Sequence, residues 1–189
     1  MSFNNPLPRV VFVGFNMEIQ KCTKEDIDEV ARFYDRVILW LKENINFPRW
    51  RYKEYPNREY VEDMTEEGSL YLCIDDDRLL GAFTLNENPL GKYENAKWIT
   101  NAKRGEYLVI HALAVAPEAQ GKGVASRAIE YSTRYAKAGG YRSVRADIVP
   151  DNLPAELLFV KNGFVFSGKA DLDRGLPDIP EFSLYEKMV

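Results

Sequence analysis

The feature that most constrains the fold is a nine-residue run, YLVIHALAV at positions 107–115, which is apolar on both faces. A strand of this kind has to be covered on both sides, as in the centre of a sheet with helices on either face. The run halts at Pro117, and Gly121 and Gly123 then stand directly before a helical pattern over 124–138. Together with a further strand over 143–149, this order predicts a right-handed parallel βαβ unit.

The remaining pattern places other elements around this unit. Apolar residues at helical spacing predict a long helix from Ile27 and shorter helices over 58–67 and 154–161. Further strands are predicted over 17–22, 68–74, 78–86, 164–170 and 181–189. We therefore expect an α/β fold with a mixed central sheet and about four flanking helices. A single domain should cover residues 1–189, with residues 1–15 as an N-terminal extension.

Composition narrows the class of protein. The net charge is -4 and the pI about 5.2, which argues against a nucleic-acid partner. No run approaches the roughly 20 apolar residues of a membrane span, and the first residues do not read as a signal peptide. The chain has one histidine and two cysteines, Cys22 and Cys73. These are too few for a His/Cys metal site, so we expect no metal. The cysteines are expected to be buried free thiols of a cytoplasmic protein.

The glycine turn has the composition of a phosphate-binding site. A strand, a turn and a helix start present unpaired backbone N–H groups and the positive end of the helix dipole. A Walker loop would need a Gly-Lys-Ser/Thr ending with another glycine five residues upstream of it, which this turn lacks. A dinucleotide fingerprint would need glycine where Ser126 stands. The pattern Gln/Arg-x-x-Gly-x-Gly/Ala matches fully over 120–125.

With this motif, the sequence resembles the GNAT N-acetyltransferase superfamily. The stretch HALAVAPEAQGKGVA is similar to the central strand and pyrophosphate loop of that family. The stretch NLPAELLFVKNGF (152–164) resembles its later motif N-x-x-A-x-x-L-Y-x-K-x-G-F. The segments RW…YP (49–56), YENAKW (93–98) and LYEKMV resemble a bacterial subset of GNAT proteins, many of them without a known acceptor.

The resemblance implies a cleft for acetyl-CoA, where the central strand and its parallel neighbour splay apart. Backbone groups of the central strand would hold the pantetheine arm, and backbone N–H groups of the turn would hold the pyrophosphate. Residues of the later motif would line the distal arm and the thioester. The implied cofactor-binding residues are Leu113, Ala114, Val115, Gln120, Gly121, Lys122, Gly123, Val124, Ala125, Ser126, Asn152, Leu158 and Phe159.

The implied reaction is direct attack of a primary amine on the thioester, in a ternary complex. His111 is a candidate base, and in a regular strand it shares a face with Leu113 and Val115; it is otherwise a half-buried structural histidine. Glu106 is the second candidate, or else a solvated edge carboxylate. The family often has a tyrosine as the acid where this chain has Phe159. The thiolate then leaves unassisted or through water, another tyrosine such as Tyr131 or Tyr185 substitutes, or the protein is not a catalyst.

Aromatic side chains are expected to frame the acceptor site, and Trp50, Tyr93 and Trp98 are the candidates for substrate binding. Alternatively, they are surface packing. The expected acceptor is a small-molecule or peptide amine, and the protein is expected to be a monomer or a homodimer. A non-catalytic acyl-CoA sensor or partner-binding module is the main alternative. A nucleotide-binding protein is disfavoured by Ser126 and by the position of the motif in the chain.

Overall fold

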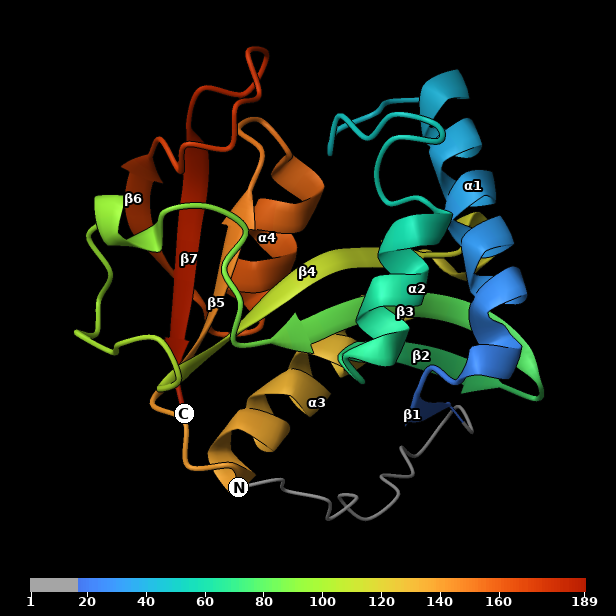
Figure 1. Ribbon diagram of the computed structural model, residues 1–189, viewed down its shortest axis with the longest axis horizontal. Helices are drawn as coiled ribbons and strands as arrows, with labels where there is room; N and C mark the ends of the chain where they lie inside the picture. Colours follow the sequence, from blue (N-terminus) through green and yellow to red (C-terminus); the bar gives the residue numbers. More distant parts are fainter. Residues whose placement is uncertain (1–16) are drawn as a thin grey trace.

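The computed structural model describes residues 17–189, so the predicted extension over residues 1–15 lies outside the described part (Figure 1). One seven-stranded mixed sheet runs through the molecule in the order β1-β2-β3-β4-β5-β7-β6. All seven predicted strands are confirmed. Their bounds are β1 (Glu18–Lys21), β2 (Leu70–Asp75), β3 (Arg78–Asn86), β4 (Tyr107–Val115), β5 (Ser143–Ile148), β6 (Val165–Ala170) and β7 (Phe182–Met188).

Four α-helices flank this sheet, as predicted: α1 (Ile27–Glu43), α2 (Arg58–Glu66), α3 (Val124–Ala138) and α4 (Leu153–Lys161). Figure 1 shows α1 and α2 on one face of β2–β4 and α3 on the other. Asn57 and Asn152 cap the starts of α2 and α4, because their side-chain oxygens accept the amides of Tyr60 and Ala155. None of the helices in residues 17–189 has the length and apolar composition that crossing a bilayer requires.

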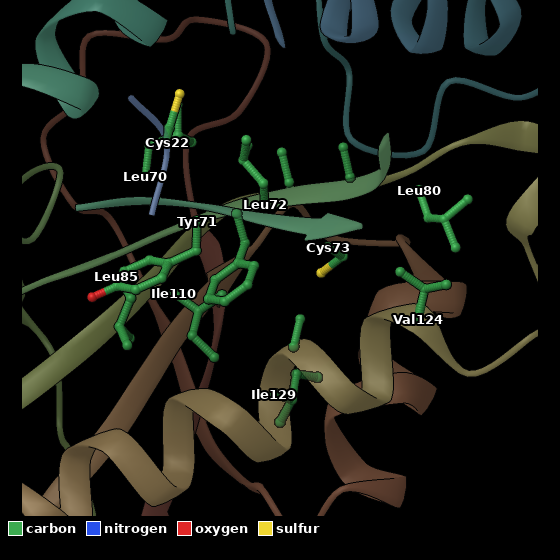
Figure 2. Close-up of a cluster of buried hydrophobic side chains, with 14 of the residues drawn as sticks. Cys22, Leu70, Tyr71, Leu72, Cys73, Leu80, Leu85, Ile110, Val124 and Ile129 are labelled. Carbon is green, nitrogen blue, oxygen red and sulfur yellow. The ribbon is translucent and has the colours of Figure 1, made fainter. Parts of the chain in front are cut away.

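The main core lies between the sheet and its helices. Figure 2 shows Tyr71, Leu85 and Ile110 pointing from the strands toward α3, which contributes Val124 and Ile129. These side chains are almost fully buried, and burial of apolar area at about 25 cal/mol per Å² is what holds α3 on the sheet. The two cysteines are buried and free, as predicted. Burial raises the pKa of Cys73 to about 12, so this thiol is inert as a nucleophile.

The parallel pairing of β4 and β5 is short. It covers Tyr107↔Ser143, Leu108↔Val144 and Val109↔Arg145, and it stops there although both strands continue. Beyond Val109, β4 is paired only with β3. The edge of β4 that faces β5 is therefore open from residue 110 onward, and this gap is the splay that the sequence predicts.

A β-bulge interrupts β4 at the same place. The register against β3 passes from Thr84↔His111 to Ala82↔Ala114, so β4 has one residue more than its partner, and Ala112 takes a positive φ of 47°. A bulge of this kind moves the following side chains to the opposite face. The carbonyl of Ala112 accepts the hydroxyl of Tyr34 on α1 at 2.9 Å, which holds the bulge in place.

A buried ion pair anchors the long loop over residues 87–106. The side chains of Arg145 on β5 and Glu186 on β7 are 2% and 0% exposed, and their Nε and Oε1 atoms are 2.9 Å apart. Glu186 also accepts the Thr100 hydroxyl at 2.6 Å, and Arg145 donates to the Ala102 carbonyl. The loop is thus attached to the sheet by charged hydrogen bonds that water does not reach.

Candidate functional site

The glycine turn presents its backbone to open space. Gly121 and Gly123 have φ values of 74° and 83°, and a Cβ added to either would meet no atom within 4 Å. The glycines are therefore required by the left-handed conformation, and they leave the approach to the helix start clear. Within residues 17–189, no backbone carbonyl accepts the amides of Gly121, Gly123, Val124, Ala125 and Ser126. These donors, at the positive end of the α3 dipole, suit a diphosphate.

The later motif lies beside this turn. Asn162, at the end of α4, donates from Nδ2 to the Ser126 hydroxyl at 3.2 Å, which joins the two elements. Asn152 uses its Oδ1 to cap α4, so only its Nδ2 is available to a ligand. Leu158 is partly exposed, whereas Phe159 is buried, with its ring centroid 4.9 Å from that of Phe164. Phe159 thus packs as a core side chain and offers no proton.

The two other tyrosines considered as an acid pack in different places. The Tyr131 ring packs 5.4 Å from Tyr71, over β2 and β3 rather than over the gap, and burial raises its pKa to about 12. The Tyr185 ring packs against Phe166 of β6. Tyr131 is thus remote from the gap, and Tyr185 stays a candidate acid.

His111 lies on the α1–α2 face, and because β4 is not regular, it does not share a face with Leu113 and Val115. His111 stands opposite Thr84, whose hydroxyl binds Tyr60 of α2. Val115 stands opposite Gly81, where an added Cβ would meet Val124 of α3. The bulge at Ala112 separates the two faces. His111 thus shares the side of the sheet with α1 and α2, while Leu113 and Val115 face α3.

The His111 ring has a defined tautomer and a low proton affinity. Its Nε2 is 3.1 Å from the Asn88 carbonyl, and a carbonyl only accepts, so Nε2 carries the proton and Nδ1 the lone pair. Burial lowers its pKa to about 4; Arg174 lowers it too, while Asp147 and the Asn88 carbonyl act in the opposite direction. The imidazole is therefore neutral near pH 7, with a lone pair on Nδ1 whose basicity is weak.

This low pKa predicts a pH dependence of stability. The folded pKa of His111, about 4, lies below the ordinary value of 6.5, so the unfolded chain binds the proton more readily. The contribution is fully present above about pH 6.5 and is lost as the pH falls toward 4, by about 3 kcal/mol at most. Urea unfolding of the wild type and of His111→Gln across this range measures it. Equal pH slopes for the two proteins would contradict it.

Glu106 does not reach the gap, which corrects its prediction as a base. It precedes β4 at the end away from the bulge, roughly 20 Å from Ala112 at about 3.3 Å per residue. Its carboxylate is 45% exposed, accepts the Lys103 amide and pairs with Arg142 at 3.4 Å. These contacts, that amide first, lower its pKa. Glu106 is thus the solvated edge carboxylate that the sequence also allowed.

Trp50 belongs to a row of aromatic rings beside the bulge. Its centroid is 6.2 Å from that of Tyr34 and 6.4 Å from that of Tyr55, and Tyr55 is 5.0 Å from Tyr60, all edge to face. We call Tyr34, Trp50, Tyr55 and Tyr60 the aromatic wall. Tyr34 and Tyr60 bind groups of β4 and β3, as described, so the wall stands over the strand segment that carries His111.

Tyr93 and Trp98 belong to the long loop and lie apart from the aromatic wall. Their rings are 4.8 Å apart, and the Arg145 guanidinium lies 4.4 Å from the Trp98 centroid. Both line a hollow of about 700 Å³ beneath the loop, together with Tyr107 and Arg145. Trp98 therefore has a packing role here. Tyr93 differs, because its hydroxyl reaches across to Asp147 of β5 at 2.6 Å.

Asp147 is the residue that the sequence analysis missed. It shares its face of β5 with Arg145, by alternation, and so lies on the α1–α2 side beside the gap. Its Oδ2 is also 2.7 Å from Nη2 of Arg174, from the β6–β7 loop. A signal was available: in SVRADIV, charged residues alternate with apolar ones in a strand whose neighbours are buried.

Two loops meet over this face of the sheet. Arg49 and Arg51, from the connector between α1 and α2, contact Asp178 of the β6–β7 loop through its carbonyl and its carboxylate. We call these contacts the Asp178 bridge. Both segments stand at the top of Figure 1, above the gap between β4 and β5. All three side chains are exposed, so the bridge is weak and can open.

Comparisons with known proteins agree with this geometry. A protein of Methanocaldococcus jannaschii, described as an uncharacterized N-acetyltransferase, is 24% identical over 151 residues, which are 77% of this chain and 59% of that relative. The chain thus spans less than two thirds of the curated relative. The solved structure of a GNAT-family acetyltransferase from Listeria monocytogenes has a TM-score of 0.73 at 17% identity, covering 96% of this chain and 99% of that one.

A second solved structure has the same fold. It is RimL, a ribosomal L7/L12 alpha-N-protein acetyltransferase in complex with coenzyme A, with a TM-score of 0.67 at 16% identity, covering 95% of this chain and 97% of that one. At such identities the likeness concerns the fold alone. The sequence profile of the Acetyltransferase (GNAT) family matches residues 35–164, well over half of the chain and including both the glycine turn and the later motif. This chain belongs to the GNAT acetyltransferase family, whose members take acetyl-CoA as acetyl donor.

Proposed function

We propose that this protein transfers the acetyl group of acetyl-CoA to a primary amine of a small molecule or peptide. The observation that carries the proposal is the coincidence of the β4–β5 gap with the free amides of the glycine turn. The described residues form one sheet, which supports a single catalytic domain. Buried free cysteines suit the reducing cytoplasm as its location. That RimL binds coenzyme A on the same fold supports the choice of donor.

In the proposed ternary complex, the diphosphate lies on the free amides of Gly121 and of residues 123–126, and the pantetheine arm lies along β4 at residues 113–115. The amine nitrogen attacks the thioester carbon, a C–N bond forms, and the C–S bond breaks to give an acetamide and coenzyme A. His111 accepts the amine proton on Nδ1, and the thiolate leaves through water because a thiol pKa near 8.5 makes it a fair leaving group. A backbone amide near Leu113 or Ala114 stabilises the oxyanion.

The test has a binding arm and a chemical arm. Acetyl-CoA at about 100 times its Kd should stabilise the protein by about 2.7 kcal/mol, measured as a thermal shift, and NAD should not. With a panel of primary amines, release of the coenzyme A thiol should depend on enzyme. His111→Gln should lower kcat with little change in the KM for acetyl-CoA. Absence of stabilisation by acetyl-CoA would contradict the proposal.

Phe159 favours a second candidate, a non-catalytic acyl-CoA sensor. Its buried ring on Phe164 supplies no acid to the leaving thiolate. The discriminating variant is Phe159→Tyr, with coenzyme A release as the readout. If the wild type is an enzyme whose thiolate needs no acid, the variant should stay within about threefold of wild-type kcat. Tight acetyl-CoA binding with no turnover of any amine, and a large gain in Phe159→Tyr, would establish the sensor instead.

A further inference from the structure

Asp147 is a buried carboxylate that the steps above do not use. Its side chain is 5% exposed, and it lies two residues beyond Arg145, where the pairing of β4 and β5 ends. Carboxylates at such depth are retained when they are paired or when they bind something. Asp147 and His111 each lie two residues beyond the last pair, Val109↔Arg145, and both face the α1–α2 side, so they stand across the gap from each other. The charge of Asp147 acts on both the His111 ring and the Tyr55 hydroxyl.

The two oxygens of Asp147 are occupied unequally. Oδ2 accepts the Tyr93 hydroxyl at 2.6 Å and lies 2.7 Å from Arg174 Nη2, as an ion pair outside hydrogen-bond geometry. Among residues 17–189, Oδ1 has no hydrogen-bond donor, and it is not sealed from solvent as an unpaired buried atom would be. A carboxylate oxygen accepts two hydrogen bonds, so Oδ1 can receive a donor from a ligand.

Arg174 is fixed by contacts other than Asp147. Its Nε donates to the Leu90 carbonyl, and its guanidinium lies 4.4 Å from the Phe182 ring centroid. The Tyr93 ring is likewise held, stacked 6.1 Å from Tyr107. Both partners of Oδ2 therefore belong to packed segments. They orient the carboxylate so that Oδ1 points away from Tyr93 and Arg174.

Aromatic residues also lie on the α1–α2 side of the sheet. The aromatic wall brings Tyr55 close enough to Asp147 for its charge to raise the Tyr55 pKa, after the larger effect of burial and those of Tyr60 and Tyr34. Ring faces attract ammonium groups, and they do so most strongly where water is excluded. The titratable and charged groups around Oδ1 are thus His111, Tyr55, Tyr93 and Arg174, and of these only Arg174 is a cation at neutral pH.

We infer that Asp147 Oδ1 and the aromatic wall receive the ammonium group of the acceptor, which is a small primary ammonium ion carried on an apolar or aromatic body. This inference rests on the proposed function and names its acceptor class. The carboxylate fixes the nitrogen beside His111, which takes the proton that the ammonium loses before attack. The proton that the nitrogen loses as the C–N bond forms passes through water to the departing thiolate.

The test compares Asp147→Asn with the wild type, using 2-phenylethylamine as the cationic probe and aniline as an acceptor that is neutral near pH 7. In the presence of coenzyme A, 2-phenylethylamine should raise the melting temperature of the wild type and not that of Asp147→Asn. Its KM should rise at least about tenfold in the variant, while the KM for aniline changes less than about threefold. Asp75→Asn, a buried aspartate on β2 remote from the gap, is the matched control.

The outcomes separate the inference from the proposed function. If 2-phenylethylamine binds in an Asp147-dependent way but no amine is acetylated, the inference holds and the enzymatic proposal fails. If amines are acetylated and Asp147→Asn impairs cationic and neutral acceptors equally, the enzymatic proposal holds and the inference is overturned. An Asp147→Asn protein that melts well below the wild type is replaced by Asp147→Glu. That variant keeps the charge and should retain the preference for 2-phenylethylamine over aniline; its loss overturns the inference.

Discussion

Replacing Gly123 by valine is expected to raise the Kd for acetyl-CoA at least about tenfold, which corresponds to about 1.4 kcal/mol. The backbone at Gly123 has φ +83°, a conformation that a β-branched residue adopts only with strain. The new side chain would also occupy the open approach to the amides of the α3 start, where the diphosphate should lie. Isothermal titration with acetyl-CoA measures the change.

The other end of the same helix offers a matched control. Gly140 has φ +75° and equally open surroundings, and it follows the last turn of α3 rather than preceding the first. Both Gly123→Val and Gly140→Val should therefore lower the free energy of unfolding by about 1–2 kcal/mol. Gly140→Val should leave the Kd for acetyl-CoA unchanged. If both variants weaken acetyl-CoA binding equally, strain in α3 explains the effect and the turn is not the diphosphate site.

Glu186→Gln is expected to lower the free energy of unfolding by about 3–5 kcal/mol, because it leaves the Arg145 charge buried without a partner. Burial alone would raise the pKa of Glu186, but hydrogen bonds from Ser143, Thr100 and Arg145 outweigh it, and the net pKa is lowered. This stabilisation is present above the unfolded carboxyl pKa of about 4.3 and is lost as the pH falls through the folded value. Urea unfolding measures both effects.

An exposed ion pair of the same chain serves as comparison. Glu106 and Arg142 are 45% and 52% exposed, so Glu106→Gln should cost less than about 1 kcal/mol and leave turnover unchanged. Hydrogen exchange adds a local readout: Glu186→Gln should expose the amides around Thr100, which Glu186 accepts at 3.0 Å, and Glu106→Gln should not. Equal losses of stability in the two variants would mean that burial does not set the strength of the Arg145–Glu186 pair.

The fold was predictable because its signals are local. Alternation, continuous apolar runs and the glycine turn define the strands and helices almost to the residue, as β4 over 107–115 and α3 over 124–138 show. The glycine turn was predictable for the same reason, since one helix start and its preceding strand form it from consecutive residues. In this turn the groups open to a ligand are backbone amides, and the positions of the glycines indicate the backbone conformation directly.

The acceptor side was only partly predictable, because it is assembled from distant segments. The Asp147 carboxylate is positioned by Tyr93 and Arg174, which are 54 residues before it and 27 residues after it in the chain. No short sequence pattern links these residues. The face of His111 could not be predicted, since a bulge adds one residue to β4 without any proline or glycine to mark it. Trp98 was selected for its residue type, which does not distinguish a ligand contact from stacking on Arg145.

The bulge at Ala112 divides one strand between two tasks. Before the bulge, Tyr107, Val109 and His111 share the face on which the acceptor is proposed to bind, and after it Leu113 and Val115 face α3, so a substitution at one of these positions is expected to act mainly on one substrate. Acceptor preference can therefore diverge by point changes in the first part of β4 while the affinity for acetyl-CoA is preserved. Deleting one residue there would exchange the two faces and abolish both specificities at once.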